Sequence, residues 1–348
     1  MATIRIRHAW YCIGTLLLAL LPTGVFAQSS SDGQISDPAW AEVRAAALKE
    51  GKVVMYGDLN ANIMGRLKPD FEKANPGITL ESARLYGPNL ISKIETEHTT
   101  GADGADVAVA VEVLNWYEGA MKQGLLKMPA GPAAKSWPAD YLLQGTVPIL
   151  QVESLLMAYN TNVVKTPITG FQDLLKPEFK GMIGVPEPVA IAIIAWYDWL
   201  EQTEGPDFPA KLAAQNPRIF PSSTPLTQSV ISGEIAAATM VSSSTVQPFV
   251  AQGAPIKVFY PASATGFRYG GAILGWAKRP NAALVFMDYL MSRRGQTAWS
   301  GTGDSASPLT GIPGSLDIKA IHPYDLKRFT TDFEKAYVEK WKTIFHRN

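Results

Sequence analysis

Cysteine, histidine and net charge are all scarce in this sequence. Its 348 residues include 1 cysteine and 4 histidines, and 31 basic side chains balance 31 acidic ones. A balanced charge argues against a general binder of polyanions such as nucleic acid. The single cysteine, Cys12, belongs to an N-terminal segment that we expect to be removed, so we expect no disulfide and no thiolate-bound metal in the mature protein. The histidines lack the paired spacing that holds zinc.

Catalytic signatures are missing as well. The chain contains no P-loop, no G-x-G-x-x-G and no G-x-S-x-G sequence, and the nearest approach to the last, at residues 303–307, lacks the second glycine. We therefore expect a protein that is not an enzyme and that needs no cofactor. A secreted enzyme whose carboxylates carry no recognisable motif stays open as an alternative.

The N-terminus has the three-part pattern of a secretory signal peptide. Arg5, Arg7 and His8 form a basic start, an apolar run follows to Leu21, and small residues surround Ala27. This pattern predicts cleavage after about Ala27 and export to the periplasm. A membrane anchor is the alternative, but the apolar run is shorter than the roughly 20 residues that span a bilayer.

Strands and helices are expected to alternate along the rest of the chain. Short apolar runs predict strands at residues 52–56, 78–83, 105–111, 155–159, 182–185, 218–220, 236–241, 256–260 and 271–277. Amphipathic stretches predict long helices at residues 281–299 and 331–345, and a shorter helix that starts at Asp37-Pro38 and ends at Gly51. Such alternation predicts an α/β fold with mostly parallel sheets, in which ligands bind beyond the carboxyl ends of the strands.

Several stretches together resemble one family. They are residues 53–56 with the polar turn after them, residues 105–107 with the helix that ends at 124–126, residues 157–160 and 171–181, Ser232-Gly233-Glu234 before an alanine-rich strand, and residues 280–296. In this order and spacing they span roughly residues 50–315. They resemble the extracellular solute-binding proteins of ABC importers, in the group that includes ferric-iron, phosphonate and polyamine binders.

The resemblance implies a two-lobed, type II-like periplasmic binding protein. Each lobe is expected to be a mostly parallel sheet flanked by helices, with hinge strands crossing near residues 152–160 and 261–271 and the ligand bound in the cleft. The expected parts are a signal peptide at 1–27, lobe 1 at 28–152 and 270–315, lobe 2 at 153–269, and a C-terminal helical segment at 316–348 on either lobe. The implied partners are a small-molecule ligand and the ABC permease in the inner membrane, with no nucleic acid and a monomeric chain. A sensor that signals to a membrane receptor would use the same cleft.

The chain departs from the iron-binding pattern of that group. Ser243 and Ser244 stand where the iron binders have a pair of tyrosines, and Asn60 stands where some have a histidine. Glu112 could still fill the acidic position. A serine hydroxyl is a poor donor for ferric iron, which favours charged oxygen ligands. We therefore expect no metal site, and a ferric-iron protein without the tyrosine pair is the alternative.

Hydroxyl-rich helix starts are expected to take the place of the metal ligands. Three clusters stand where a predicted strand leads into a helix: Ser242, Ser243 and Ser244; Ser222, Ser223 and Thr224; and the segment that begins at Glu187. Free N–H groups and the positive end of the dipole attract anions to helix amino ends. Ordinary N-capping by Ser and Thr is the alternative for each cluster.

Two arginines and several neighbouring side chains complete the expected site. Arg84 and Arg268 could bind a carboxylate or phosphonate through paired hydrogen bonds, although a surface ion pair is the commoner role of an arginine. Tyr86 and Tyr269 could line the cleft. Asp58 and Glu112 could instead bind an amino group of the ligand, or cap the helix that follows each. Together these residues predict a cleft for a small organic anion such as a phosphonate, a phosphate ester or a carboxylate.

Overall fold

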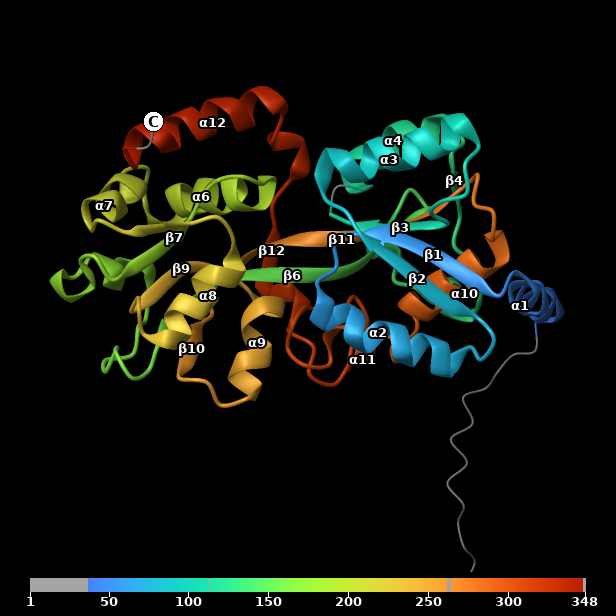
Figure 1. Ribbon diagram of the computed structural model, residues 1–348, viewed down its shortest axis with the longest axis horizontal. Coiled ribbons are helices and arrows are strands. Elements are labelled where there is room, and N and C mark those ends of the chain that lie inside the picture. The colour runs from blue at the N-terminus through green and yellow to red at the C-terminus, as the bar shows by residue number, and fades with distance from the viewer. Residues whose placement is uncertain (1–36, 112, 262–263, 347–348) are drawn as a thin grey trace, which may run out of the picture. The chain divides into compact units, whose positions relative to one another are not determined.

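The computed structural model describes residues 37–111, 113–261 and 264–346, so the expected signal peptide lies outside the described residues. Strands and helices alternate in the described part, as the sequence predicts (Figure 1). The strands are β1 (Lys52–Gly57), β2 (Thr79–Arg84), β3 (Val107–Ala110), β4 (Leu126–Lys127), β5 (Leu142–Leu143), β6 (Val147–Asn160), β7 (Ile183–Pro186), β8 (Arg218–Phe220), β9 (Ala237–Ser242), β10 (Ile256–Phe259), β11 (Ala264–Leu274) and β12 (Ile321–Pro323). The helices are α1 (Pro38–Glu50), α2 (Ala61–Ala74), α3 (Gly87–Thr100), α4 (Val113–Lys122), α5 (Pro132–Lys135), α6 (Ile191–Glu204), α7 (Phe208–Ala214), α8 (Ser223–Ser232), α9 (Ser243–Ala251), α10 (Pro280–Met291), α11 (Arg293–Ser300) and α12 (Thr331–Ile344).

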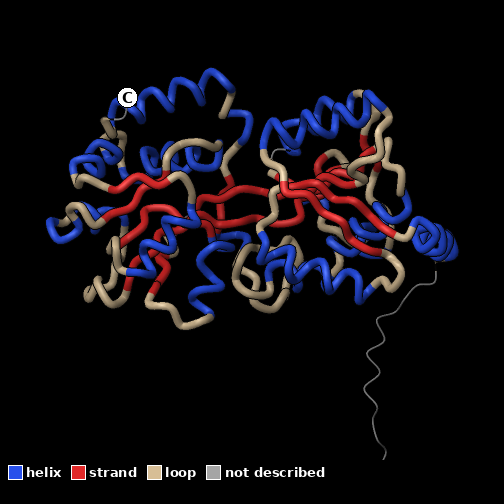
Figure 2. The backbone as a smooth tube through the Cα atoms, viewed as in Figure 1, coloured by secondary structure: helices blue, strands red, loops and turns tan. Residues whose placement is uncertain are grey.

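One mixed sheet connects two halves, which we call lobe 1 and lobe 2. Its strand order is β2-β1-β3-β11-β6-β9-β7-β8. Lobe 1 is built on β1, which pairs in parallel with β2 and β3, and lobe 2 is built on β7, which pairs in parallel with β8 and β9. Figure 2 shows helices on both faces of these strands. The α/β fold with a mostly parallel sheet in each lobe is therefore confirmed.

The strands β6 and β11 cross between the lobes. They pair antiparallel with each other, β11 also pairs with β3 of lobe 1, and β6 also pairs with β9 of lobe 2. Every residue of β6 is buried. In their register Phe267 lies opposite Glu153, and Arg268 lies opposite Val152. Because side chains alternate along a strand, these two pairs face opposite sides of the sheet.

The expected strands at residues 155–159 and 271–277 are too short. The structure extends the first back to Val147 and moves the second to Ala264–Leu274. Polar side chains interrupt the apolar pattern in both places, for example Gln151 and Glu153 in β6. These side chains find hydrogen-bond partners inside the protein, such as Ser305 for Gln151, so burial does not leave them unsatisfied.

Each lobe has an apolar core of its own. The core of lobe 1 contains Phe71, Phe286 and Trp299, and the core of lobe 2 contains Trp196. Helix α12 adds Trp341 to the core of lobe 2. Within the C-terminal segment, which the sequence allows on either lobe, α12 thus packs on lobe 2, while Ile321 and Leu326 before it pack in one cluster with Leu114 of lobe 1. No helix among the described residues is long and apolar enough to cross a membrane.

The single helix expected at residues 281–299 is wrong, because the structure has α10 and α11 in its place. Ser292 between them has an extended backbone (φ −76°, ψ 156°), and its hydroxyl accepts a hydrogen bond from the N–H of Gly295 at 3.1 Å. A Cβ atom at Gly295 would lie 2.0 Å from the carbonyl oxygen of Tyr289, so only glycine allows this close turn. The apolar periodicity continues across the break and conceals it.

Arg279 ties the start of α10 to the sheet of lobe 1. Its guanidinium, which is buried, donates to Asp106 at 2.6 Å and to Asp103 at 2.7 Å. Asp106 also accepts from the N–H of Val54 in β1 at 2.8 Å. This buried ion pair holds together three segments that are far apart in the sequence.

Candidate ligand-binding cleft

A cavity of about 610 Å³ lies between the two lobes and next to the crossing strands. This volume is typical of small-molecule sites, which commonly measure about 300–1,000 Å³. From lobe 1 the lining residues are Asp58, Asn60, Ala61, Asn62, Arg84, Tyr86, Val111 and Asn115. From lobe 2 they are Ala190, Ile191, Ala192, Ser222, Ser223, Thr224, Ser242, Ser244, Thr245 and Phe249. The crossing strands and the C-terminal segment add Glu153, Phe267, Tyr269, Tyr324 and Leu326.

The cavity lies at the carboxyl ends of the parallel strands of both lobes. In lobe 1, Asp58 directly follows β1, Arg84 ends β2, and Val111 follows β3. In lobe 2, Ser222 follows β8 and Ser242 ends β9. This is the position at which open α/β sheets bind ligands.

Three helices of lobe 2 begin at this cavity, and none of them has a side-chain cap. The N-cap residues are Ala190 of α6, Ser222 of α8 and Ser242 of α9, and no side chain of these residues accepts a hydrogen bond from its own first turn. By contrast, Asn60 caps α2 and Thr330 caps α12 with their side chains. Capping, the alternative role of the serine clusters, is therefore not what Ser222 and Ser242 do in this structure.

The first N–H groups of α6 and α8 are available to a ligand. Within the described part of the chain, the N–H groups of Ile191, Ala192, Ser223 and Thr224 have no hydrogen-bond acceptor. All four residues border the cavity. A helix amino end also carries the equivalent of about half a positive charge. Both features favour a negatively charged group at this wall of the cleft.

Hydroxyl groups surround the start of α9. The hydroxyls of Ser242 and Thr245 are 2.8 Å apart, and the hydroxyl of Ser223 accepts from the N–H of Ser242 at 3.1 Å. The second of these bonds ties the start of α8 to the end of β9. The wall that lobe 2 presents therefore consists of hydroxyls and backbone N–H groups, with the apolar ring of Phe249 at one side.

Lobe 1 contributes a cation and an aromatic ring to the facing wall. The Nε atom of Arg84 donates to the carbonyl oxygen of Asp58 at 3.3 Å, and its guanidinium lies over the ring of Tyr86 at 4.9 Å from the centroid. The carboxylate of Asp58 is buried and accepts from the N–H of Val111 at 3.4 Å. The hydrogen bond to the carbonyl oxygen of Asp58 and the contact with the ring of Tyr86 hold Arg84 at the edge of the cleft. Its two terminal guanidinium nitrogens can there donate to an anion.

Asn60 joins the two walls. Its side-chain oxygen caps α2 by accepting from the N–H of Ile63 at 3.0 Å, and its side-chain nitrogen donates to the hydroxyl of Ser244 at 2.8 Å. Ser244 belongs to α9 of lobe 2, so this bond links the lobes across the cavity.

Glu153 of β6 is a lining residue that the sequence analysis missed. Its carboxylate accepts from the N–H of Ser244 at 3.2 Å, from the hydroxyl of Ser244, and from the hydroxyl of Tyr269 at 3.2 Å. Burial raises the pKa of this carboxyl to about 7. The hydrogen bonds that it accepts favour the ionised form and lower the pKa, but the effect of burial is larger. The available signal was a single acidic residue in a segment that is otherwise uncharged from Val147 to Asn160.

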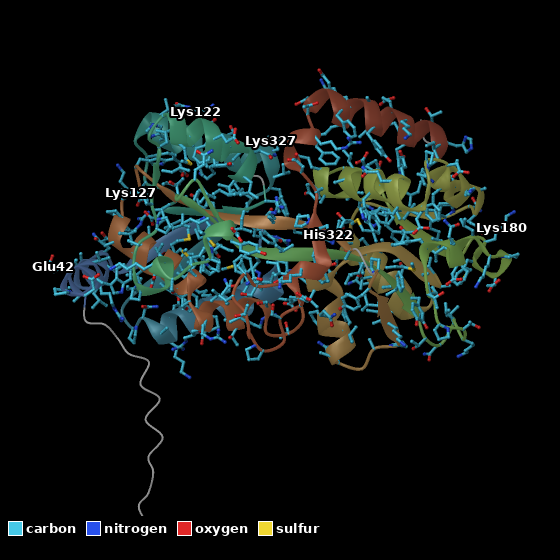
Figure 3. The ribbon with its side chains drawn as sticks, turned by 180° about the vertical axis from the view of Figure 1, so that it is seen from behind. Glu42, Lys122, Lys127, Lys180, His322 and Lys327 are labelled. Carbon is cyan, nitrogen blue, oxygen red and sulfur yellow. The ribbon has the colours of Figure 1, made fainter. Side chains whose placement is uncertain are left out.

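Three of the expected site residues that the structure describes do not border the cavity. Arg268 is exposed on the opposite face of β11 and borders another depression, because it alternates with Phe267 and Tyr269, which face the cleft. Figure 3, seen from behind, labels His322 of that same depression. Ser243 is buried and donates its hydroxyl hydrogen bond to the backbone of Asp304.

The third of these residues is Glu187. Glu187 continues the pairing of β7 with β8 by donating its N–H to the carbonyl oxygen of Phe220 at 2.8 Å, and α6 starts only at Ile191. Ala190 is therefore the cavity residue of that segment. Glu112 lies outside the described residues.

The expected residues that do meet at the cavity come from both lobes. They are Asp58, Asn60, Arg84, Tyr86, Ser222, Ser223, Thr224, Ser242, Ser244 and Tyr269. The sequence analysis missed Asn62, Asn115, Phe249, Phe267 and Tyr324, which carry no pattern that separates them from surface or core residues. Among the described residues there is no group of three or more histidine, cysteine, aspartate or glutamate side chains that could hold a metal ion.

A comparison with families of proteins identifies the class to which this architecture belongs. The model of the bacterial extracellular solute-binding proteins matches residues 67–321, which is more than half of the chain. An uncharacterized protein of Haemophilus influenzae is 36% identical over 99 residues, and this match covers 26% of the chain and 28% of that protein.

Solved structures of similar fold are periplasmic binding proteins. The substrate binding protein of an ABC transporter from Agrobacterium tumefaciens is similar with a TM-score of 0.72 and 15% identity, over 86% of this chain and 96% of that one. AfuA from Actinobacillus pleuropneumoniae, with exogenous fructose-6-phosphate bound, has a TM-score of 0.62 and 19% identity, over 85% of this chain and 99% of that one. Iron-bound HitA from Pseudomonas aeruginosa has a TM-score of 0.63 and 15% identity, over 84% of this chain and 99% of that one.

Identities this low show the fold alone, and the ligands named are those of the similar proteins. The fold is that of the two-lobed periplasmic binding proteins, so the resemblance seen in the sequence is confirmed. The matched family consists of transport proteins and is not a class of enzymes. The chain belongs to the family of bacterial extracellular solute-binding proteins.

Proposed function

We propose that this protein captures a small organic anion in its cleft and delivers it to the permease of an ABC importer. A phosphonate, a phosphate ester or a carboxylate would suit the site. The observation that carries the proposal is that α6 and α8 direct uncapped amino ends at the same cavity that Arg84 borders from lobe 1. Helix amino ends and arginine are both suited to oxyanions, since they supply several N–H donors and positive charge.

The geometry also suits capture by closure. An anion at the amino ends of α6 and α8 would meet Arg84 when the lobes approach each other, and β6 and β11 are the segments about which the lobes can bend. Asn60 and Ser244 already form a hydrogen bond between the lobes. A closed cleft would remove water from the anion and strengthen each charged contact.

The ferric-iron alternative has less support. Ser244 borders the cavity where the iron-binding relatives are expected to have a tyrosine, while Ser243 is turned away toward Asp304. Asn60, at the position of the expected histidine, donates its side-chain nitrogen to Ser244. Neutral hydroxyl and amide groups are weak ligands for ferric iron compared with phenolate and carboxylate.

A thermal-shift screen tests the proposal. Mature protein would be unfolded and refolded to remove any bound ligand, and then mixed with glycerol 3-phosphate, aminoalkylphosphonates, carboxylates, polyamines, thiamine, and ferric iron with and without a synergistic anion. A ligand present at about 100 times its dissociation constant stabilises the folded state by about 2.7 kcal/mol. For the expected mature chain of about 320 residues, this corresponds to a rise of about 4 °C in Tm.

The outcome separates the alternatives. A rise with phosphorylated, phosphonate or carboxylate compounds supports the proposal, and isothermal titration calorimetry would then give the affinity. A rise with ferric iron alone would refute it and restore the metal alternative. Pull-down of a candidate ABC permease of the same organism, with and without the ligand, would test delivery to the importer.

A further inference from the structure

Glu153 gives the three helix starts of the cleft unequal roles. The carboxylate lies at the amino end of α9, where it accepts from the N–H of Ser244 at 3.2 Å and also from the Ser244 hydroxyl. It is only 1% exposed, although it borders the cavity. The starts of α6 and α8 have no such internal anion: their first N–H groups have no acceptor within the described part of the chain.

The carboxylate also orients the hydroxyl groups beside it. A hydroxyl has one proton to donate and two lone pairs with which to accept. Ser244 donates its proton to Glu153 and accepts from the side-chain nitrogen of Asn60 at 2.8 Å. The hydroxyl of Ser242 is 3.5 Å from that of Ser244, and it is 2.8 Å from that of Thr245. With the proton of Ser244 committed to Glu153, this hydroxyl offers no donor to the cavity. Whichever of Ser242 and Thr245 donates to the other, oxygen lone pairs of this pair are left for the cavity.

We propose that Glu153 is a positioning residue that fixes the orientation of the ligand: the anionic group of the ligand binds at α6 and α8, and a hydrogen-bond donor of the ligand faces α9. This inference rests on the proposed function and names its ligand class. A second anion at α9 would be repelled by the carboxylate, whereas a hydroxyl or ammonium group would meet acceptor oxygens. The ligand is therefore an organic anion that carries a hydroxyl or an amino group on the part remote from the charge.

The test compares ligands that share an anion and differ in the donor. One pair is propyl phosphate and glycerol 3-phosphate, and a second is ethylphosphonate and 2-aminoethylphosphonate. Calorimetric titrations give the ratio of the two affinities within each pair. They are made at pH 8, which is above the pKa of about 7 to which burial raises Glu153, so that the carboxyl is mostly ionised. In the natural protein the donor-bearing member is expected to bind about tenfold more tightly.

Glu153→Gln is the main variant, since it keeps the shape of the side chain and removes the charge. It should reduce the ratio to between about one and about three, because the donor of the ligand loses the negative charge that it faces at α9. Asp288→Asn is the matched control. Asp288 is likewise a carboxylate at a helix start, where it accepts from the N–H groups of Ala133 at 2.8 Å and Ala134 at 3.0 Å, and it lies outside the cleft. The control should leave the ratio unchanged.

The possible results are distinct. If no member of either pair binds the natural protein, the proposed function fails and the inference fails with it. If the anions bind but Glu153→Gln keeps the ratio of the natural protein, the role of Glu153 is refuted and the proposed function stands. Should Glu153→Gln not fold, Ser244→Ala decides the question, because it removes the hydroxyl through which Glu153 acts on the cavity wall and should lower the ratio in the same way; an unchanged ratio in that variant overturns the inference.

Discussion

Ala190 offers a test in which stability and binding should change in opposite directions. It is the N-cap residue of α6 and it borders the cleft. Its backbone (φ −146°, ψ 152°) already has the extended conformation of an N-cap, but alanine has no side chain to accept from the first turn. Ala190→Asp would supply that acceptor and place a negative charge at the positive end of the helix. From typical capping energies we expect the free energy of unfolding to rise by about 0.5–2 kcal/mol.

The same substitution should weaken anion binding severely. The introduced carboxylate would use the N–H group of Ala192, the second residue of the helix, and repel the anion of the ligand. Two unit charges about 5 Å apart repel by about 3 kcal/mol at an effective dielectric constant of about 20. That energy corresponds to a loss of affinity of roughly a hundredfold. An uncharged cap in Ala190→Asn is the matched control: it should stabilise α6 by a similar amount and weaken binding much less.

Two measurements check this prediction. Urea unfolding without ligand reports the stability, and a gain of about 0.5–2 kcal/mol corresponds to a rise of about 1–3 °C in Tm for a chain of this length. Titration calorimetry with the anions of the screen reports the affinity. If Ala190→Asp stabilises the protein but leaves the affinity unchanged, no anion binds at α6 and the argument from its uncapped amino end is wrong.

Three further predictions follow from side chains with well-defined surroundings. Arg84→Ala should weaken binding of the anion about tenfold or more in titration calorimetry, since charge-assisted hydrogen bonds contribute about 1.5–3 kcal/mol. Arg268→Ala, on the opposite face of the sheet, is the control and should leave the affinity unchanged. Equal losses of affinity in both variants would contradict the assignment of Arg84 to the ligand. Burial raises the pKa of Glu153 from 4.5 to about 7, so between pH 4.5 and pH 7 the folded state binds more protons than the unfolded state. The free energy of unfolding should therefore fall by about 3 kcal/mol as the pH rises from about 4.5 to about 7. Unfolding curves of Glu153→Gln should lack this component, and a pH dependence identical to that of the natural protein would count against it. Arg279→Ala should lower the free energy of unfolding by about 3–5 kcal/mol, because it leaves the buried carboxylate of Asp106 without its partner. Arg294→Ala breaks an exposed ion pair and should lower it by at most about 1 kcal/mol. Similar losses in urea unfolding would refute this distinction.

The fold could be predicted from local patterns because alternation of strands and helices is a local property. The start of α1 at Asp37-Pro38 and its end at Gly51 follow from capping chemistry, and the structure has both. The lengths of β6 and β11 could not be predicted, since polar residues in them are satisfied by partners distant in the sequence. The break at Ser292 was also missed, because it depends on a close approach of two backbone segments at Gly295.

The candidate site could be predicted where it depends on the ends of strands. It could not be predicted where it depends on which face of the sheet a side chain occupies. Ser222 and Ser242 follow predicted strands, so their place at the cavity follows from the topology of parallel sheets. Arg268 is different, since one residue of shift along β11 decides whether a side chain faces the cleft, and no sequence pattern fixed the register with β6. The pairing of Arg268 with Val152 places the arginine on the face of the sheet away from the cavity, whereas Tyr269 borders the cavity.

The amino ends of helices show why residue type alone leaves binding and capping unresolved. Serine at the start of a helix predicts a cap, yet Ser222 and Ser242 do not cap, and the hydroxyl of Ser223 is engaged with β9. Ala190 gives the more decisive sequence signal, because an alanine cannot cap at all. A helix that begins with a poor N-cap directly beyond a parallel strand leaves its N–H groups to water or to a ligand. In a cleft that closes, exclusion of water leaves the ligand as their partner, and for this reason the apolar start of α6 supports anion binding more strongly than either serine cluster does.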